Sequence, residues 1–216
     1  SFRIIESFGA HSMFSGIVEC TGEISKVINH GDVLSIEVIC PDGFNKNLQS
    51  GASISVDGVC LTSKDNGNEA LKFDVIGETI NRTNFSTMIV GNKVNLERSI
   101  KASSEIGGHL MSGHVQCTGK IIEVKIRENT RDILIEIPDR YASYVMEKGY
   151  IGINGCSLTI GEVIDNCFYI HLIPETLKIT NISRLNVKDI ANIEIDQNTI
   201  AIVDTVNKVL LAQKSS

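Results

Sequence analysis

The chain has 216 residues, of which 42% are hydrophobic and 21% charged, and its formal net charge is −6. This composition predicts a packed globular core. The charges are spread along the chain, whereas a nucleic-acid surface needs clustered Lys and Arg, and no apolar run approaches the roughly 18–20 residues of a membrane-spanning helix. We therefore expect a protein that binds neither nucleic acid nor membrane.

The chain begins with SFRIIESFGAHS (1–12), which precedes a Met with the appearance of a natural start. We interpret residues 1–12 as an N-terminal extension or a cloning remnant and leave them out of the fold prediction.

Short segments rich in β-branched residues follow, several with the period-two alternation of strands that have one buried face. They lie at 33–41, 53–62, 71–79 and 93–97, and again at 132–138, 150–160 and 167–173. Turn signals such as NHGD and DNGN separate them. Roughly six short strands per half, with almost no helical stretches, predict a small antiparallel barrel in each half.

The last segment, TIAIVDTVNKVLLAQK (199–214), differs because Ile202, Val206, Val209 and Leu210 recur at helical spacing. Such a helix can pack on its own chain, or it can be an oligomerisation element whose apolar stripe is buried against other copies.

The six cysteines form no paired CxxC motifs, and no His cluster has the spacing of a zinc site. There is no signal peptide, so we expect reduced thiols in a cytoplasmic protein without a metal site.

Two stretches of the chain are nearly the same: MFSGIVECTG (13–22) and LMSGHVQCTG (110–119), 97 positions apart. Residues 13–27 and 110–124 share eight identities in fifteen positions. The same offset aligns 56–62 with 153–159, 74–84 with 171–181 and 90–97 with 187–194. The chain is therefore a duplicated domain. We assign 13–109 to the N-terminal barrel, 110–198 to the C-terminal barrel and 199–213 to the helix.

Three motifs occur in both halves: SG-x-V, then G-x-[CS]-L-T, then ET. Backbone groups of the glycine segments, together with Thr hydroxyls, can hydrogen-bond a flat heterocycle rich in amides. The alternative is that Thr and Glu merely cap strands. Neither a GxxxxGK[ST] phosphate loop nor a GxSxG nucleophile motif is present.

Single residues leave more alternatives open. His109 and His114 are five positions apart, a spacing that suits neither one helix face nor one strand face, so a shared metal is not expected. Cys60 fits a small buried residue, but Ser157 at the matching position indicates a place for a small protic group. Asp196 could be a surface acid.

Five segments together resemble the riboflavin synthase family, alpha-subunit type. They are MFSGIVE (13–19), EIGGHLMSGHV (105–115), KGYIGINGCSLTIGEV (148–163), HLIPETL (171–177) and IEIDQNTIAIVDTV (193–206). The resemblance implies an all-β fold, with two homologous six-stranded antiparallel Greek-key barrels in tandem and a C-terminal α-helix. It also implies a dismutation without a cofactor, in which one 6,7-dimethyl-8-ribityllumazine transfers a four-carbon unit to another. The products would be riboflavin and 5-amino-6-(ribitylamino)uracil. The family's subunits form a homotrimer whose active sites lie between subunits, and lumazine synthase is a candidate partner.

The resemblance carries two sets of substrate-binding residues onto this sequence. The first pocket would consist of Gly16, Ile17, Val18, Cys60, Leu61, Thr62, Asp74, Val75, Ile76, Gly77, Glu78 and Thr79. The second would consist of Gly113, His114, Val115, Lys148, Ser157, Leu158, Thr159, His171, Leu172, Ile173, Pro174, Glu175 and Thr176.

The implied chemistry removes a proton from the 7-methyl group of one lumazine and adds a nucleophile to C7 of the other. We hypothesise that Ser157, His114 and Asp196 assist in the second pocket, with Cys60 as a nucleophile or proton carrier in the first. Water could also be the nucleophile. Differences between the repeats should separate donor from acceptor: Ile17 against His114, Cys60 against Ser157 and Ser99 against Asp196.

Asn154 departs from the resemblance, because the family often has Asp before Gly-x-Ser-Leu-Thr. An amide cannot act as a base, so a hydrogen-bonding role is expected there. Two rival functions share the fold: a fluorescent protein that holds lumazine without turnover, and a flavin barrel for electron transfer. Relatives of the first lose the ET and GHLMSGH patterns in one half, and the second expects a nicotinamide domain after the barrels.

Overall fold

The computed structural model describes residues 12–66, 70–101 and 103–214. The segment set aside as an extension lies, apart from Ser12, outside the described residues. The first half contains strands β1 (Cys20–Asn29), β2 (Val33–Ile39), β3 (Ser53–Val56), β4 (Val59–Thr62), β5 (Asp65–Asn66), β6 (Ala70–Ile76) and β7 (Lys93–Arg98). The second half contains β8 (Cys117–Ile126), β9 (Arg131–Glu136), β10 (Tyr150–Ile153), β11 (Cys156–Thr159), β12 (Val163–Ile164), β13 (Cys167–Leu172) and β14 (Ile190–Ile195).

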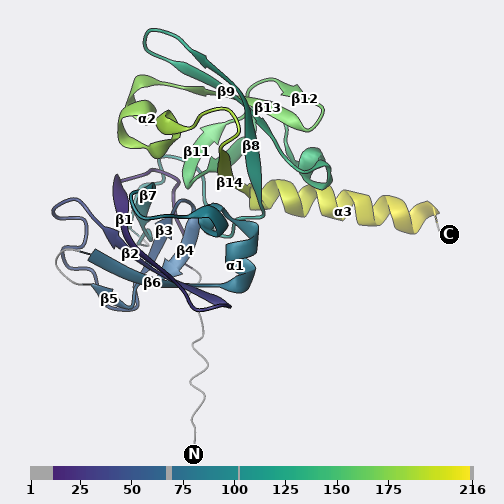
Figure 1. Ribbon diagram of the computed structural model, residues 1–216. Coiled ribbons are helices and arrows are strands. Elements are labelled where there is room, and N and C mark those ends of the chain that lie inside the picture. Colours follow the sequence, from purple (N-terminus) through teal and green to yellow (C-terminus); the bar gives the residue numbers. More distant parts are fainter. Residues whose placement is uncertain (1–11, 67–69, 102, 215–216) are drawn as a thin grey trace, which may run out of the picture.

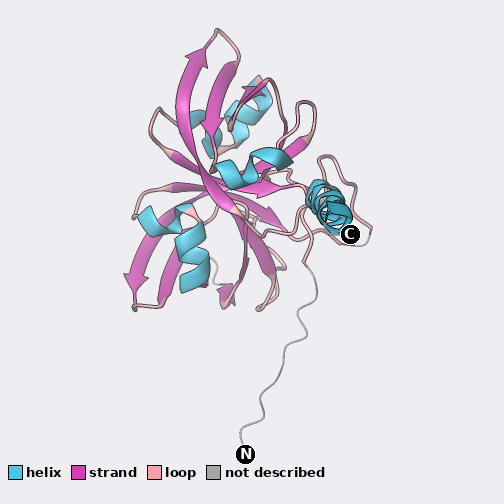
Figure 2. Ribbon diagram, turned by 90° about the vertical axis from the view of Figure 1, so that its right-hand side faces the viewer, coloured by secondary structure: helices cyan, strands magenta, loops and turns pink. Residues whose placement is uncertain are grey.

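The two halves have the same antiparallel topology. The strand order is β4-β3-β7-β1-β2-β6-β5 in the first sheet and β11-β10-β14-β8-β9-β13-β12 in the second. In each, the fourth strand also contacts the sixth, β4 with β6 and β11 with β13, which curls the sheet into a barrel. Figures 1 and 2 show the two barrels stacked on one another. The predicted all-β fold with two tandem barrels is confirmed, and each sheet gains a two-residue strand.

Short helices were not expected. Helix α1 (Gly77–Arg82) follows β6, and α2 (Pro174–Ile179) follows β13. Three short 3-10 helices are also present: η1 (Asn84–Thr87), η2 (Asp139–Tyr144) and η3 (Asn181–Arg184). The predicted strand 71–79 therefore ends at Ile76. In the second half, Pro174 opens α2, where its missing N–H costs no helical hydrogen bond.

Each barrel has its own apolar core. Large buried side chains include Ile36, Phe73 and Leu96 in the first barrel and Ile121, Ile135 and Phe168 in the second. One residue of each repeat packs into the barrel of the other repeat. Val18 belongs to the core of the second barrel, and Val115 packs against the core of the first.

Helix α3 (Gln197–Lys214) confirms the helical periodicity of the C-terminal segment. Its carboxyl end projects away from both barrels (Figure 1). The hydroxyl group of Tyr144 in η2 donates a hydrogen bond to Asp204 Oδ1 at 2.6 Å and holds the first half of the helix. Ile202, Val206, Val209 and Leu210 are each at least 50% exposed, so the chain's own barrels do not cover this stripe. In the part of the chain that the structure describes, no helix is long and apolar enough to cross a membrane.

Candidate functional site

Each of the two SG-x-V segments is hydrogen-bonded to the barrel of the other repeat. The backbone N–H of Ser157 donates to the carbonyl oxygen of Gly16 at 2.8 Å, and the N–H of Cys60 donates to that of Gly113 at 2.9 Å. A Cβ atom added to Gly16 would lie 2.5 Å from Cβ of Ser157, and one added to Gly113 would lie 2.5 Å from Cβ of Cys60. Both glycines have positive φ, 73° and 75°. Each glycine is therefore required twice, for its backbone conformation and for the close approach.

This exchange corrects the predicted pockets. Gly16, Ile17 and Val18 were assigned to the pocket of Cys60, but Gly16 contacts Ser157 and Val18 belongs to the core of the second barrel. Gly113, His114 and Val115 lie in the first barrel beside Cys60. A repeat shows which segments are alike, and a segment that fits one barrel also fits its homologue.

Two buried glutamates hold the exchanged segments at their start. Glu97 accepts hydrogen bonds from the N–H and hydroxyl of Ser15, at 2.7 and 2.8 Å, and from the N–H of Gly16 at 3.1 Å. Glu194 repeats this pattern with Ser112 and Gly113 at 2.7, 3.0 and 3.1 Å. Burial raises the pKa of both carboxyl groups, that of Glu194 to about 7. These residues were not predicted from the sequence, although both end a repeated segment, NLE and NIE.

The first half-site is a cavity of about 230 Å³ in the first barrel. Its lining joins both repeats: Val59, Cys60, Glu78, Thr79, Arg82, Thr83, Gly113, His114 and Val115. Burial raises the pKa of the Cys60 thiol, so the group is protonated at neutral pH. His114 is exposed beside it. The cavity therefore contains a neutral thiol and a histidine beside α1.

The second half-site surrounds Ser157 and consists of Gly16, His109, Tyr150 and Ser157. His109 Nδ1 lies 2.7 Å from Ser157 Oγ, and its ring stacks on Tyr150 with a centroid distance of 5.3 Å. His109 is 8% exposed, and its Nε2 has no hydrogen-bond partner among the described residues. Burial lowers the pKa of His109, which keeps the imidazole neutral at neutral pH. A neutral imidazole next to a hydroxyl can take up a proton from it or through it.

The predicted group of Ser157, His114 and Asp196 is therefore not brought together as expected. His114 belongs to the first half-site, and the histidine beside Ser157 is His109. Asp196 Oδ2 accepts hydrogen bonds from the N–H and hydroxyl of Thr199, at 3.0 and 2.9 Å, and so caps the start of α3. Its charge still acts on His109 and opposes the lowering of that residue's pKa.

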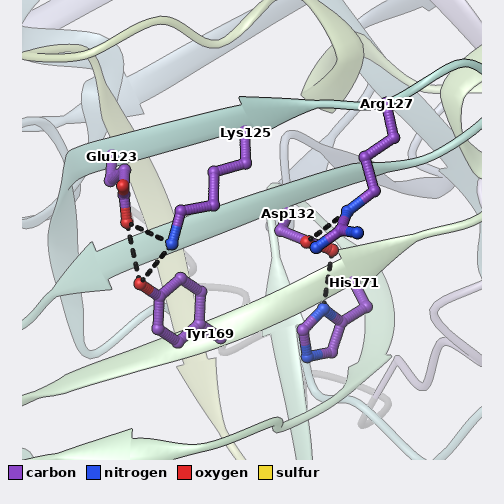
Figure 3. A network of polar contacts seen from close by, with 6 residues as sticks. All are labelled: Glu123, Lys125, Arg127, Asp132, Tyr169 and His171. Atoms are coloured by element: carbon purple, nitrogen blue, oxygen red, sulfur yellow. Dashed lines mark hydrogen bonds and ion pairs between the residues drawn. The ribbon is translucent and has the colours of Figure 1, made fainter.

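His171 lies in a polar network on the outer face of the second barrel (Figure 3). Its Nδ1 is 2.7 Å from Asp132 Oδ1 on the neighbouring strand, and Arg127 approaches the other oxygen at 3.2 Å. The hydrogen bond with His171 holds the pKa of Asp132 below its usual range. Next to this pair, Tyr169 donates to Glu123 at 2.7 Å (Figure 3).

The matching cross-strand pair of the first barrel has the acid on the opposite strand. Ser35 Oγ donates to Asp74 Oδ1 at 2.7 Å, and Lys64 Nζ lies 2.6 Å from Asp74 Oδ2. The two repeats thus present a carboxylate at 74 and an imidazole at 171.

The remaining predicted binding residues fall into three groups by burial. The side chains of Leu61, Val75 and Leu172 are buried in the cores, so these positions can reach a ligand only with their backbone. The exposed positions are Thr62, Ile76, Lys148, Thr159, Ile173, Pro174 and Glu175. Gly77, Leu158 and Thr176 are partly buried. Over the described ranges there is no cluster of three or more His, Cys, Asp or Glu that could hold a metal ion.

Comparisons with known proteins agree on both halves. A family model described as lumazine binding domain matches residues 15–99 and again 112–196. Riboflavin synthase of Escherichia coli (strain K12) is 40% identical over 205 residues, which are 94% of this chain and 96% of the relative. Riboflavin synthase of Buchnera aphidicola subsp. Baizongia pistaciae is 38% identical over 204 residues, with 94% and 96% covered.

Solved structures give a second comparison. LumP complexed with riboflavin is similar with a TM-score of 0.80 and 29% identity, over 85% of this chain and 100% of the other. LumP complexed with 6,7-dimethyl-8-(1'-D-ribityl) lumazine gives a TM-score of 0.79 and 27% identity, over 85% and 99%.

Proposed function

Because the chain belongs to the riboflavin synthase family and has two lumazine binding domains, we propose that it joins two molecules of 6,7-dimethyl-8-ribityllumazine. One molecule would give up a four-carbon unit and become 5-amino-6-(ribitylamino)uracil, and the other would become riboflavin. The resemblance seen in the sequence is confirmed by these matches, and the chain is an enzyme of this family.

The observation that carries the proposal is the pair of composite half-sites. Each combines a G-x-[CS]-L-T strand of one repeat with an SG-x-V segment of the other, so the two have one backbone plan. A reaction between two identical molecules needs two similar binding surfaces that hold them face to face. Holding both rings in place supplies proximity and orientation, which can account for much of the rate.

The side chains differ where the chemistry must differ. In the second half-site, the neutral His109 beside Ser157 is suited to removing the proton from a 7-methyl group, with Ser157 between base and substrate. In the first, the protonated Cys60 thiol favours a proton carrier over a thiolate nucleophile. The two products together contain the atoms of two substrates, so the balance requires no oxidant.

A complete site would need a second subunit. The first half-site cavity of about 230 Å³ is smaller than the roughly 300–1,000 Å³ of typical ligand pockets. The uncovered stripe of α3 offers a surface for association. We therefore propose a homotrimer in which the N-terminal barrel of one subunit faces the C-terminal barrel of the next. The partner role of lumazine synthase and the domain boundary at 109/110 stay predictions.

One alternative has a specific observation in its favour. The LumP structures contain bound riboflavin or lumazine, so a similar fold can hold such molecules as ligands. In this chain both ET motifs and the GHLMSGH segment are intact, and the latter supplies His109 and His114. These residues favour turnover over storage.

The test is an incubation of the purified protein with 6,7-dimethyl-8-ribityllumazine, under nitrogen and without added cofactor. Chromatography should show riboflavin accumulating over many turnovers. Lumazine that binds tightly but is recovered unchanged would contradict the proposal and support the ligand-holding alternative.

A further inference from the structure

The two barrels meet at the turns of two hairpins. Asp57 and Gly58 connect β3 to β4, and Asn154 and Gly155 connect β10 to β11. All four have positive φ, between 44° and 82°, as in the tight two-residue turns that suit right-twisted hairpins. A Cβ atom on Gly58 would lie 2.7 Å from the backbone nitrogen of Gly155, so the turns are in direct contact. The two reacting positions, Cys60 and Ser157, each follow three residues after the first turn residue.

Asp57 is the acid of this junction and is 1% exposed. Its Oδ1 accepts from the N–H of Asn95 at 2.7 Å and from Asn181 Nδ2 at 2.9 Å. Its Oδ2 accepts from Asn84 Nδ2 at 2.9 Å. Burial raises the pKa of Asp57 to about 6, so at neutral pH the group is ionised and both oxygens accept.

Asn154, the matching residue of the second repeat, both accepts and donates hydrogen bonds with its side-chain amide. Its Oδ1 accepts from the N–H of Asn192 at 2.8 Å, as Asp57 does from Asn95. Its Nδ2 donates to Asn181 Oδ1 at 3.2 Å. Asn181 has its own Nδ2 committed to Asp57 and to the carbonyl oxygen of Lys93, at 2.9 Å each.

Asn84 and Asn192 have their side-chain amide orientations fixed in the same way. Asn84 Oδ1 accepts from Asn192 Nδ2 at 3.0 Å, because its Nδ2 is used by Asp57. Asn192 cannot turn its amide over, since its Oδ1 accepts from the N–H of Asn84 at 2.7 Å and its Nδ2 donates to the carbonyl oxygen of Asp57 at 2.8 Å.

This hydrogen-bond network accommodates a carboxylate at position 57 and a carboxamide at position 154, and not two groups of the same kind. An amide at position 57 would point its NH₂ at the NH₂ of Asn84, and turning Asn84 over only moves the conflict to Asn192. A carboxylate at position 154 would point an oxygen at Asn181 Oδ1, and turning Asn181 over would point that oxygen at Asp57 and Lys93. In either case a buried polar group loses its partner, which is costly.

We propose that Asp57 is a positioning residue, and that the junction requires one carboxylate opposite one carboxamide to hold both half-sites in place. The family often has Asp at the position of Asn154, and in this chain Asp57 supplies that carboxylate from the other repeat. The exchange of the two residues, Asp57→Asn together with Asn154→Asp, keeps one carboxylate and one carboxamide at the junction. Because the repeat relates position 57 to 154, Asn84 to Asn181 and Asn95 to Asn192, each asparagine can take over the role of its counterpart. The catalytic part of this inference rests on the proposed function, and the part on stability does not.

The experiment compares Asp57→Asn, Asn154→Asp and the double variant. Asp165→Asn is the matched control, because Asp165 also has positive φ (54°) in a hairpin turn but is exposed. Each single change should lower the melting temperature by about 5 °C or more. At a temperature where the singles remain folded, kcat should fall about tenfold with a smaller change in KM. The double variant should recover the melting temperature to within about 2 °C and kcat to within about twofold.

Three results would overturn the inference. Additive losses in the double variant would show that the two positions are independent. A loss in Asp57→Asn no larger than in Asp165→Asn would remove the requirement for the buried acid. Singles with lowered melting temperature but unchanged kcat would leave a structural role and refute positioning. If a single variant does not fold, recovery of the fold in the double variant decides. If even the wild type forms no riboflavin, the melting temperatures still test the junction.

Discussion

The N–H of Ser157 donates a hydrogen bond to the carbonyl oxygen of Gly16, and the N–H of Cys60 donates to that of Gly113. Each bond joins one repeat to the barrel of the other. Neither barrel therefore has a complete half-site of its own, and the duplicated chain functions as one unit.

The first prediction concerns this close approach. Replacing Gly113 by Ala would place a methyl group 2.5 Å from Cβ of Cys60 and should lower kcat/KM about 100-fold by displacing the segment that contains His114. Gly43→Ala is the control, because Gly43 also has positive φ (90°) but no atom within 4 Å. It should cost about 1 kcal/mol of stability and leave kcat/KM within about twofold of the wild type. Equal losses in both variants would contradict the packing argument.

A second prediction separates chemistry from binding at Ser157. Ser157→Ala should lower kcat by about 10²-fold or more with little change in KM, because general acid–base groups contribute about that much. His109→Asn should reproduce the effect and remove a limb of the pH–rate profile. Ser143→Ala, at an exposed serine, serves as control in steady-state kinetics. An unaltered kcat in Ser157→Ala would exclude this residue from proton transfer.

A third prediction follows from Glu194, whose pKa rises from 4.5 to about 7 because the carboxyl group is buried. Between these pH values the folded state binds a proton that the unfolded state has lost. The unfolding free energy therefore falls as pH rises through this window, by about 3 kcal/mol for this group.

Glu194→Gln removes the titrating group. The difference in unfolding free energy between wild type and variant, measured with denaturant at pH 4.5 and pH 7.5, should change by about this amount. Glu162→Gln, at an exposed position, is the control for the loss of one carboxylate. A pH-independent difference for Glu194→Gln would contradict the assignment.

A fourth prediction tests the surface of α3. Val206→Asp places a charge in the uncovered stripe and should convert a trimer into monomers in sedimentation experiments, with loss of activity. Asn207→Asp changes the neighbouring residue on the same helix and should keep the wild-type mass. If the wild type itself sediments as a monomer, the site between subunits is wrong.

Much of the fold could be predicted because the same strand pattern occurs in both halves of the sequence. Alternation in VLSIEVI and DILIEI marks buried faces, and one offset of 97 positions makes the two barrels alike. Helices α1 and α2 escaped prediction because six residues carry too little periodicity.

The sequence predicted the motifs that form the site, but it assigned the SG-x-V segments to the wrong half-sites. Identical motifs fit either barrel, so the exchange of Gly16 and Gly113 depends on how the barrels pack. His109 was considered only as a metal ligand, because its approach to Ser157 is a tertiary contact across 48 positions. The segment GGHLMSGH nevertheless contained it.

The most direct test of the account is the stoichiometry of the reaction under nitrogen without added cofactor. Two molecules of 6,7-dimethyl-8-ribityllumazine consumed should give one riboflavin and one 5-amino-6-(ribitylamino)uracil, in a ratio that stays constant over many turnovers. Lumazine that is bound and released unchanged, or riboflavin formed without an equal amount of the second product, would contradict the account.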